Sequence, residues 1–147
     1  MNMKLLKEKL ALGCLLYGLV IGHVKAQERS VPALDLSDCV RTYDPAIAST
    51  TKVGHQFWFV DKQFLDGRTL KLSAVAPGKA THPPHQHEED EFFLVLEGRA
   101  EFFLDGKTKV VEPYTTLYCP PFSMHGIRNV GEVELKYLVI KKYKLGE

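Results

Sequence analysis

The amino-acid sequence predicts an all-β fold, with short strands arranged as a sandwich or a barrel. Beyond residue 50, β-prone runs rich in aromatic and branched residues are separated by Gly and Pro at intervals of about ten residues. Some of these runs alternate apolar and polar residues with the period of two that is typical of a half-buried strand. No segment of this part shows a convincing helical pattern. The predicted domain therefore consists of strands and turns.

The first 26 residues are predicted to be a signal peptide. Three lysines within the first nine residues precede an apolar run at residues 10–22, and Val24-Lys25-Ala26 offers small residues at the positions that a signal peptidase recognises. The run is shorter than the roughly 18 residues of a membrane span, although an uncleaved anchor stays open as an alternative. Cys14 suggests a lipoprotein only weakly, because apolar residues continue beyond it. We expect an exported protein, periplasmic or secreted, that begins at Gln27.

Cleavage after Ala26 leaves 121 of the 147 residues, which is enough for one domain with a core. The removed segment carries four lysines and one glutamate, so the net charge changes from +1 to −2. This balance indicates neither a nucleic-acid partner nor a membrane-surface partner after cleavage. Residues 27–60 are predicted to form an N-terminal arm with the first strands, and residues 61–147 a barrel in the same domain.

Two cysteines, Cys39 and Cys119, remain in the mature chain. In an exported protein they could form one disulfide. They could equally be two small buried residues with free thiols. The sequence does not supply the distance between them, so both readings stay open.

Turn-forming residues separate the predicted strands. In the strand at residues 68–76, Leu70, Leu72 and Ala74 alternate with polar residues, and Pro77-Gly78 ends it. The arm is expected to hold at most one short strand of its own. The other predicted strands are residues 56–60, 91–96, 100–104, 107–111, 115–118 and 133–140.

Two turns organise the middle of the chain. Asp105-Gly106 between two of these strands is a strong hairpin signal. The letters EFFL at Glu91 and again at Glu101 suggest adjacent strands, and a turn at Glu97-Gly98 would place Phe93 opposite Phe102. Residues 92–96 are continuously apolar, so that strand is expected to be covered on both faces.

One polar cluster interrupts this pattern. His85, His87 and Glu91 stand at i, i+2 and i+6, so an extended backbone can present all three on one face. His125 is a fourth candidate, four residues before Asn129. Imidazole nitrogens and one carboxylate suit a divalent first-row metal with open positions for a substrate. A solvated polar loop between strands is the plain alternative.

The residues of this stretch resemble the first motif of the cupin family. Gly78, His85, His87, Glu91 and Gly98 match it, with six residues instead of the usual five in the first spacer. The second motif is matched by Pro120, His125 and Asn129, while Phe122 stands where the family has Gly. That departure leaves the local turn in question, but not the ligand. The resemblance covers residues 70–140.

The resemblance implies a double-stranded β-helix, the jelly-roll barrel of the cupins. It also implies that His85, His87, Glu91 and His125 bind one divalent transition metal: Fe, Mn, Ni, Cu or Zn. Strand alternation from Glu91 and His125 then places further side chains at the pocket, with plain core packing as the alternative. These candidates are Phe93, Val95, Phe102 and Ile127, with His82 as a rim histidine.

The cupin family contains enzymes and non-catalytic proteins alike, so fold alone does not give the function. The first expectation is a small metal-dependent oxidoreductase, dioxygenase-like, that acts on an oxygen-bearing organic compound. A sugar-binding or small-acid-binding module, an isomerase or epimerase, and a structural metal site are the alternatives. No catalytic residue beyond the ligands is assigned. A homodimer is expected, because the apolar strand, the Trp58 segment and the arm offer surfaces for a second copy.

Overall fold

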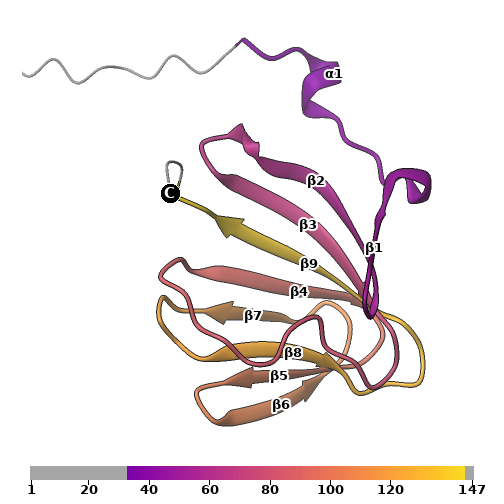
Figure 1. The fold of residues 1–147 in the computed structure, drawn as a ribbon, viewed down its shortest axis with the longest axis vertical. Coiled ribbons are helices and arrows are strands. Elements are labelled where there is room, and N and C mark those ends of the chain that lie inside the picture. The colour runs from indigo at the N-terminus through magenta and orange to yellow at the C-terminus, as the bar shows by residue number, and fades with distance from the viewer. Residues whose placement is uncertain (1–32, 145–147) are drawn as a thin grey trace, which may run out of the picture. The chain divides into compact units, whose positions relative to one another are not determined.

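The computed structural model describes residues 33–144. The predicted signal peptide and the start of the arm therefore lie outside the described residues. Two short helices come first and strands follow, as Figure 1 shows. In chain order the elements are α1 (Leu36–Cys39), the 3-10 helix η1 (Pro45–Ile47), β1 (Ser49–Thr51), β2 (Gly54–Leu65), β3 (Arg68–Val75), β4 (Glu91–Glu97), β5 (Ala100–Leu104), β6 (Lys107–Val111), β7 (Thr116–Cys119), β8 (His125–Asn129) and β9 (Leu135–Lys142).

Two antiparallel sheets build the domain (Figure 1). The larger has the strand order β1-β2-β3-β9-β4-β7, and the smaller has the order β6-β5-β8. Non-consecutive strands are neighbours in both sheets, which is the sign of a jelly roll and confirms the predicted fold class. The core between them includes Phe93, Val95, Phe102, Ile127 and Tyr137.

Each strand predicted from residue 56 onward is present, with ends that differ by a few residues. Asp105-Gly106 forms the expected two-residue hairpin, because both residues have positive φ and Leu104 pairs with Lys107. The list of predicted strands lacks β8, since its sequence HGIRN shows neither alternation nor a continuous apolar run; only the expected shared face of His125 and Ile127 implied a strand there. The helix α1 was also missed. It is one turn long, and Asp35 caps it through the backbone N–H of Asp38.

The predicted pairing of β4 with β5 is wrong. β4 lies between β9 and β7 in the larger sheet, whereas β5 belongs to the smaller one. Gly98, with a φ of 81°, lets the chain pass from one sheet to the other, and a Cβ there would lie 2.8 Å from the carbonyl oxygen of Glu134. Phe93 and Phe102 still meet, but across the core, with ring centroids 6.5 Å apart.

The larger sheet is not covered evenly on both faces. On β4, the inward residues are buried, but the outward Phe92 remains 41% exposed. The prediction that this strand is covered on both faces is therefore wrong for the described residues 33–144. On β3, Leu70 and Leu72 line an outer groove with Tyr43 of the arm. The polar set of the same strand, which includes Lys71 and Ser73, faces the interior. The leucines thus mark the outer face of this strand.

Neither cysteine of the described domain forms a disulfide. Cys39 is exposed in α1, while Cys119 is buried on β7 opposite Glu91. Burial, together with the nearby Glu91 carboxylate, raises the pKa of the Cys119 thiol to about 12. Cys119 therefore behaves as a small core residue. Within residues 33–144, no helix is long and apolar enough to cross a lipid bilayer.

Candidate metal centre

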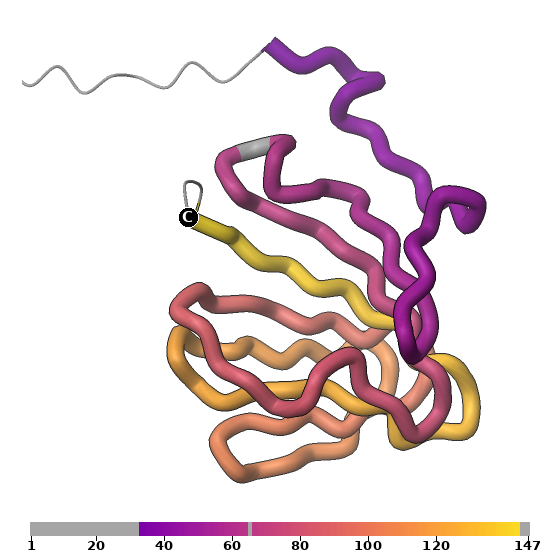
Figure 2. The backbone as a smooth tube through the Cα atoms, viewed as in Figure 1, coloured from indigo at the N-terminus to yellow at the C-terminus, as the bar shows by residue number. Residues whose placement is uncertain are grey.

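The backbone brings His85 next to His125. The segment between β3 and β4 runs beside β8, as the tube in Figure 2 shows, and pairs with it at two places. Gly78 and Lys79 exchange backbone hydrogen bonds with Asn129, and His85 exchanges two with His125 at 3.0 and 2.8 Å. An antiparallel bridge places two residues directly opposite each other, with their side chains on one side. A loop residue and a strand residue forty positions later thereby become neighbours.

His87 and Glu91 complete the set from the two ends of a short turn. The carbonyl oxygen of His87 accepts a hydrogen bond from the backbone N–H of Phe122 at 2.7 Å, which ties this turn to the loop before β8. Glu91 begins β4 and pairs with Cys119 on one side and Lys141 on the other. Its side chain is buried in the ligand cluster, so it is directed into the barrel from β4, next to the edge strand β7.

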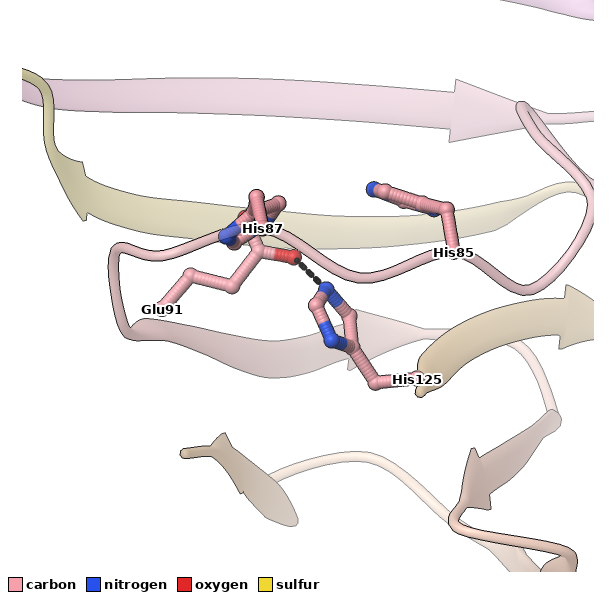
Figure 3. Close-up of side chains that lie close together, drawn as sticks. All are labelled: His85, His87, Glu91 and His125. Carbon is pink, nitrogen blue, oxygen red and sulfur yellow. Dashed lines mark ion pairs between the residues drawn. The ribbon is translucent and has the colours of Figure 1, made fainter. Parts of the chain in front are cut away.

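The four predicted ligands converge, as Figure 3 shows. One ligand atom from each of His85, His87, Glu91 and His125 lies within 4.8 Å of the others. His125 is fully buried and Glu91 is 6% exposed, whereas His85 and His87 are half-buried. The cluster thus has a buried floor and a more open side, an arrangement suited to a bound metal that a substrate can reach.

A backbone carbonyl orients each imidazole. The Nδ1 atoms of His85, His87 and His125 lie 3.2, 2.6 and 2.8 Å from the carbonyl oxygens of Pro83, Glu89 and Ser123. A carbonyl oxygen accepts only, so these contacts place the proton on Nδ1 and leave Nε2 with a free lone pair. Metal-binding histidines are oriented by this kind of second contact.

The Nε2 atoms of two of these histidines are placed where they could bind a cation. Nε2 of His87 and Nε2 of His125 are buried and have no hydrogen-bond partner. Nε2 of His125 lies 2.9 Å from a carboxylate oxygen of Glu91, and Nε2 of His87 lies 3.7 Å from the other oxygen. Buried lone pairs facing a carboxylate are costly without a positive charge between them. The donor set and these unpartnered atoms fit one divalent metal ion.

A cavity of about 100 Å³ opens beside the four ligands. Of the predicted pocket residues, Phe93, Ile127 and His82 line it, while Val95 and Phe102 lie in the core and are not among its walls. His82 is exposed and its ring centroid is 5.7 Å from that of His85. Partial desolvation of its ring, and then the neighbouring His85, lowers the pKa of His82. His82 thus lines the cavity beside the ligand cluster, and its role at the rim stays a prediction.

The cavity also has polar walls that the sequence did not predict. Lys71, Thr81, Tyr137, Lys141 and Tyr143 all line it. The hydroxyl groups of Thr81 and Tyr137 lie 3.2 Å apart. Burial lowers the pKa of the Lys71 ammonium, although the Glu91 carboxylate opposes this shift. Lys71 alternates with the leucines of β3, and that pattern did not assign it to the interior. Lys141 lies on the face of Tyr137 and Val139, one residue past the predicted strand at residues 133–140.

A second and larger cavity of about 360 Å³ adjoins the first. The two cavities share Thr81, His82, Gly126 and Ile127. The walls of the larger one also include Pro84, Phe103 and Arg128. Both cavities therefore lie against the same four residues.

The unusual Phe122 does not disturb the turn. Phe122 has a φ of 61°, the left-handed conformation that a Gly adopts without strain. Its N–H still contacts His87, and Ser123 donates to the carbonyl oxygen of Pro120 at 3.2 Å. These bonds hold the loop that ends at His125. The departure from the motif at this position therefore leaves the ligand in place.

Fold and site together define the class of protein. Residues 71–141 match the family model described as a cupin domain. These residues span β3 from Lys71 onward, the histidine segment, β4 to β8 and nearly all of β9. This match and the jelly-roll fold support a small cupin domain, with a cluster of three histidines and one glutamate able to hold a metal ion.

Two curated relatives share part of this sequence. An uncharacterized protein of Methanocaldococcus jannaschii is 36% identical over 71 residues, which cover 48% of this chain and 57% of that protein. A protein of Bacillus subtilis named H2HPP isomerase is 32% identical over 82 residues, which cover 55% of this chain and 35% of that protein. The chain thus spans about half of the first relative's length and a third of the second's.

Solved structures agree with the fold. A cupin 2 conserved barrel domain protein from Salinispora arenicola has a TM-score of 0.60 at 21% identity, with 76% of this chain and 90% of that chain covered. Other similar structures are described as a predicted oxalate decarboxylase and a polyketide cyclase, with TM-scores of 0.56 and 0.58. At identities of 21% and 22% these likenesses concern the fold alone.

We expect the metal affinity to depend on pH through the imidazoles. A histidine must be neutral to bind a metal, so affinity should stay level above about pH 6.5 and fall below it. Burial, and then the positive charge of Lys141, lowers the pKa of His87. A lowered pKa keeps this ring neutral to a lower pH. Protonation of His87 therefore begins to weaken metal binding at a lower pH than protonation of an ordinary histidine would. Competition with a coloured chelator between pH 8 and pH 5 measures this, and an affinity that stays constant to pH 5 would argue against imidazole ligands.

Proposed function

We propose that this protein is a metal-dependent cupin enzyme that acts on a small oxygen-bearing organic substrate. His85, His87, Glu91 and His125 bind one divalent transition metal. The carrying observation is the pair of buried, unpartnered Nε2 atoms on His87 and His125, which face the Glu91 carboxylate. A bound metal ion supplies Lewis acidity, which polarises a substrate oxygen.

The remaining residues of the cavity position the substrate and move protons. The apolar side chains of Phe93 and Ile127 limit the space beside the ligands. The hydroxyl groups of Thr81 and Tyr137 form a pair that can donate a hydrogen bond to a substrate oxygen. His82 stands at the rim, where its imidazole can exchange a proton with solvent.

Dioxygenation is the first candidate reaction, as the cupin resemblance suggested. Isomerisation is the second, and two observations favour it. The Bacillus subtilis relative is named an isomerase. The cavity also holds groups suited to proton transfer, among them His82 and Tyr137. These groups weaken the case for a binding module without catalysis, which rested on a pocket with few acids and bases.

Metal content and two activity assays test these candidates. We would purify the protein, measure its metals by elemental analysis and record electron paramagnetic resonance spectra. A redox-active metal and oxygen uptake with added substrate support the oxygenase. For the isomerase, pyruvate serves as a test compound because it has C–H bonds next to a carbonyl group. Metal-dependent exchange of deuterium into it, followed by nuclear magnetic resonance, supports isomerisation. Folded protein that binds no divalent metal would contradict both.

We also propose that the protein is exported and begins at Gln27. The support is the basic start, the apolar run at residues 10–22 and Ala26 at its end. Mass spectrometry of protein from the exported fraction should give a mass that begins at or near Gln27. Recovery of the full-length chain from membranes would contradict this proposal.

A homodimer is proposed for the same protein. Three exposed residues lie on neighbouring strands of the larger sheet: Phe92 on β4 pairs in register with Tyr118 on β7 and with Ile140 on β9. All three are 41–45% exposed. A connected apolar patch of this kind is typical of an interface. Light scattering should give twice the chain mass for the wild type and a shift toward the monomer for Phe92→Glu. A wild-type monomer across micromolar concentrations would rule the dimer out.

A further inference from the structure

Two lysines line the cavity beside the metal ligands. Lys141 on β9 pairs in register with Glu91 on β4, and Lys71 on β3 pairs with Val139. Residues 139 and 141 share one face of β9, so both lysines are on the inner face of the larger sheet. Both are among the walls of the 100 Å³ cavity. The larger sheet thus adds two positive charges to the space in front of the ligands.

The two ammonium groups differ in their partners. Nζ of Lys141 lies 3.4 Å from a carboxylate oxygen of Glu89, and its side chain is only 8% exposed. Nζ of Lys71 lies over the Trp58 ring, 5.0 Å from its centroid. Among residues 33–144, no carboxylate is within ion-pair distance of Lys71 Nζ. A half-buried ammonium is seldom left without an acidic partner.

We propose that this cavity selects a small organic anion, whose carboxylate lies against Lys71 and Lys141. This inference rests on the proposed function, because another oxygen of the same molecule would face the metal ligands. A volume of about 100 Å³ equals the liquid share of roughly three water molecules, so the bound end has only a few heavy atoms. A cation–π contact with the Trp58 ring limits the positions that the Lys71 ammonium can take.

A different role for the lysines makes a different prediction. If they only balanced the charge of Glu89 and Glu91, removing Lys71 would alter metal affinity and leave the choice between charged and neutral ligands unchanged. If Lys71 binds the substrate anion, its removal weakens the preference for charged over neutral ligands and leaves the metal content unchanged. The two roles are therefore separated by measuring metal and ligand on the same samples.

The probes are glycolate and glycolamide, which share a hydroxyl group and differ in a carboxylate or a neutral amide. Zinc-loaded protein is titrated with each at fixed pH and ionic strength. The readouts are calorimetry and the fluorescence of Trp58, the single tryptophan of the chain. We expect glycolate to bind at least about tenfold more tightly than glycolamide, which corresponds to about 1.4 kcal/mol.

Lys71→Met removes the charge and retains an apolar side chain. It should bring the two probes to within about twofold of each other in calorimetry, with zinc content unchanged. Lys141→Met should also reduce the preference for glycolate over glycolamide. It provides a second test of the proposal if Lys71→Met does not fold. Lys109→Met is the matched control, because Lys109 is exposed on β6 and away from the cavity walls. It should behave as the wild type.

Three outcomes would contradict these statements in distinguishable ways. Zinc-loaded wild type that binds both probes equally overturns the inference alone. The inference is also overturned if both lysine variants fold, retain zinc and still prefer glycolate by tenfold. Wild type that takes up no zinc or other divalent metal overturns the proposed function, and the inference falls with it.

Discussion

His125→Ala is expected to abolish stable metal binding by the folded protein. His125 is fully buried, its Nδ1 is oriented by Ser123, and its Nε2 lies 2.9 Å from Glu91. Changes to residues that merely orient metal ligands cost about 10- to 100-fold in affinity, so losing a ligand itself should cost roughly 100-fold or more. His85→Ala, His87→Ala and Glu91→Ala should behave in the same way. Metal content after dialysis, measured on protein shown to be folded by circular dichroism, is the test.

His82→Ala is the matched control for these variants. His82 lines the same cavity and its ring lies near that of His85, but its nitrogens are not in the ligand cluster. We expect it to retain about one equivalent of metal. If His82→Ala loses the metal while His85→Ala and His125→Ala retain it, the assignment is wrong. Equal loss in all five variants would place His82 in the site.

Asn129→Ala is expected to lower the free energy of unfolding by about 3 kcal/mol. The Asn129 side chain is fully buried and makes three hydrogen bonds. Its Nδ2 donates to the carbonyl oxygens of Val75 and Val133 at 2.8 and 2.7 Å, and its Oδ1 accepts from Gly131 at 2.9 Å. Alanine leaves all three backbone groups without this partner. Each buried group left unpaired costs about 1–3 kcal/mol, less where water reaches it.

Urea unfolding of metal-free protein measures this loss without a contribution from metal binding. Gln63→Ala is the control, because it also removes an amide but from an exposed position on β2. It should change the stability by less than about 0.5 kcal/mol. A loss below about 1 kcal/mol for Asn129→Ala would mean that other groups or water replace these bonds. Since Asn129 joins the end of β3 to the turn before β9, its role is structural.

Much of the fold was predicted because its signals are local. The Asp105-Gly106 hairpin depends on two residues that tolerate positive φ. The inward set of β9, Leu135, Tyr137 and Val139, follows from alternation along a single strand. The spacing of His85, His87 and Glu91, with His125 farther on, led to a cluster that the structure brings together.

The same local sequence patterns did not predict which strands pair with each other. The repeat of EFFL suggested adjacent strands, yet β4 and β5 lie in different sheets. The sequence of a strand shows which of its residues share a face, but not which strands lie beside it, because many apolar strands can pack equally well against the same face. β8 has only five residues and no regular pattern, and its place depends on its bonds to β5 and to the histidine segment.

The sequence by itself determined the class of fold, the ligand residues worth testing and the residues of the hairpin. Only the tertiary structure decided which face of β3 is inside. Its leucines lie in the outer groove with Tyr43 of the arm, and this leaves Lys71 among the walls of the cavity. The physical reason is that alternation separates two faces without assigning either to the interior. That assignment depends on what covers each face, and here the cover comes from segments distant in the chain.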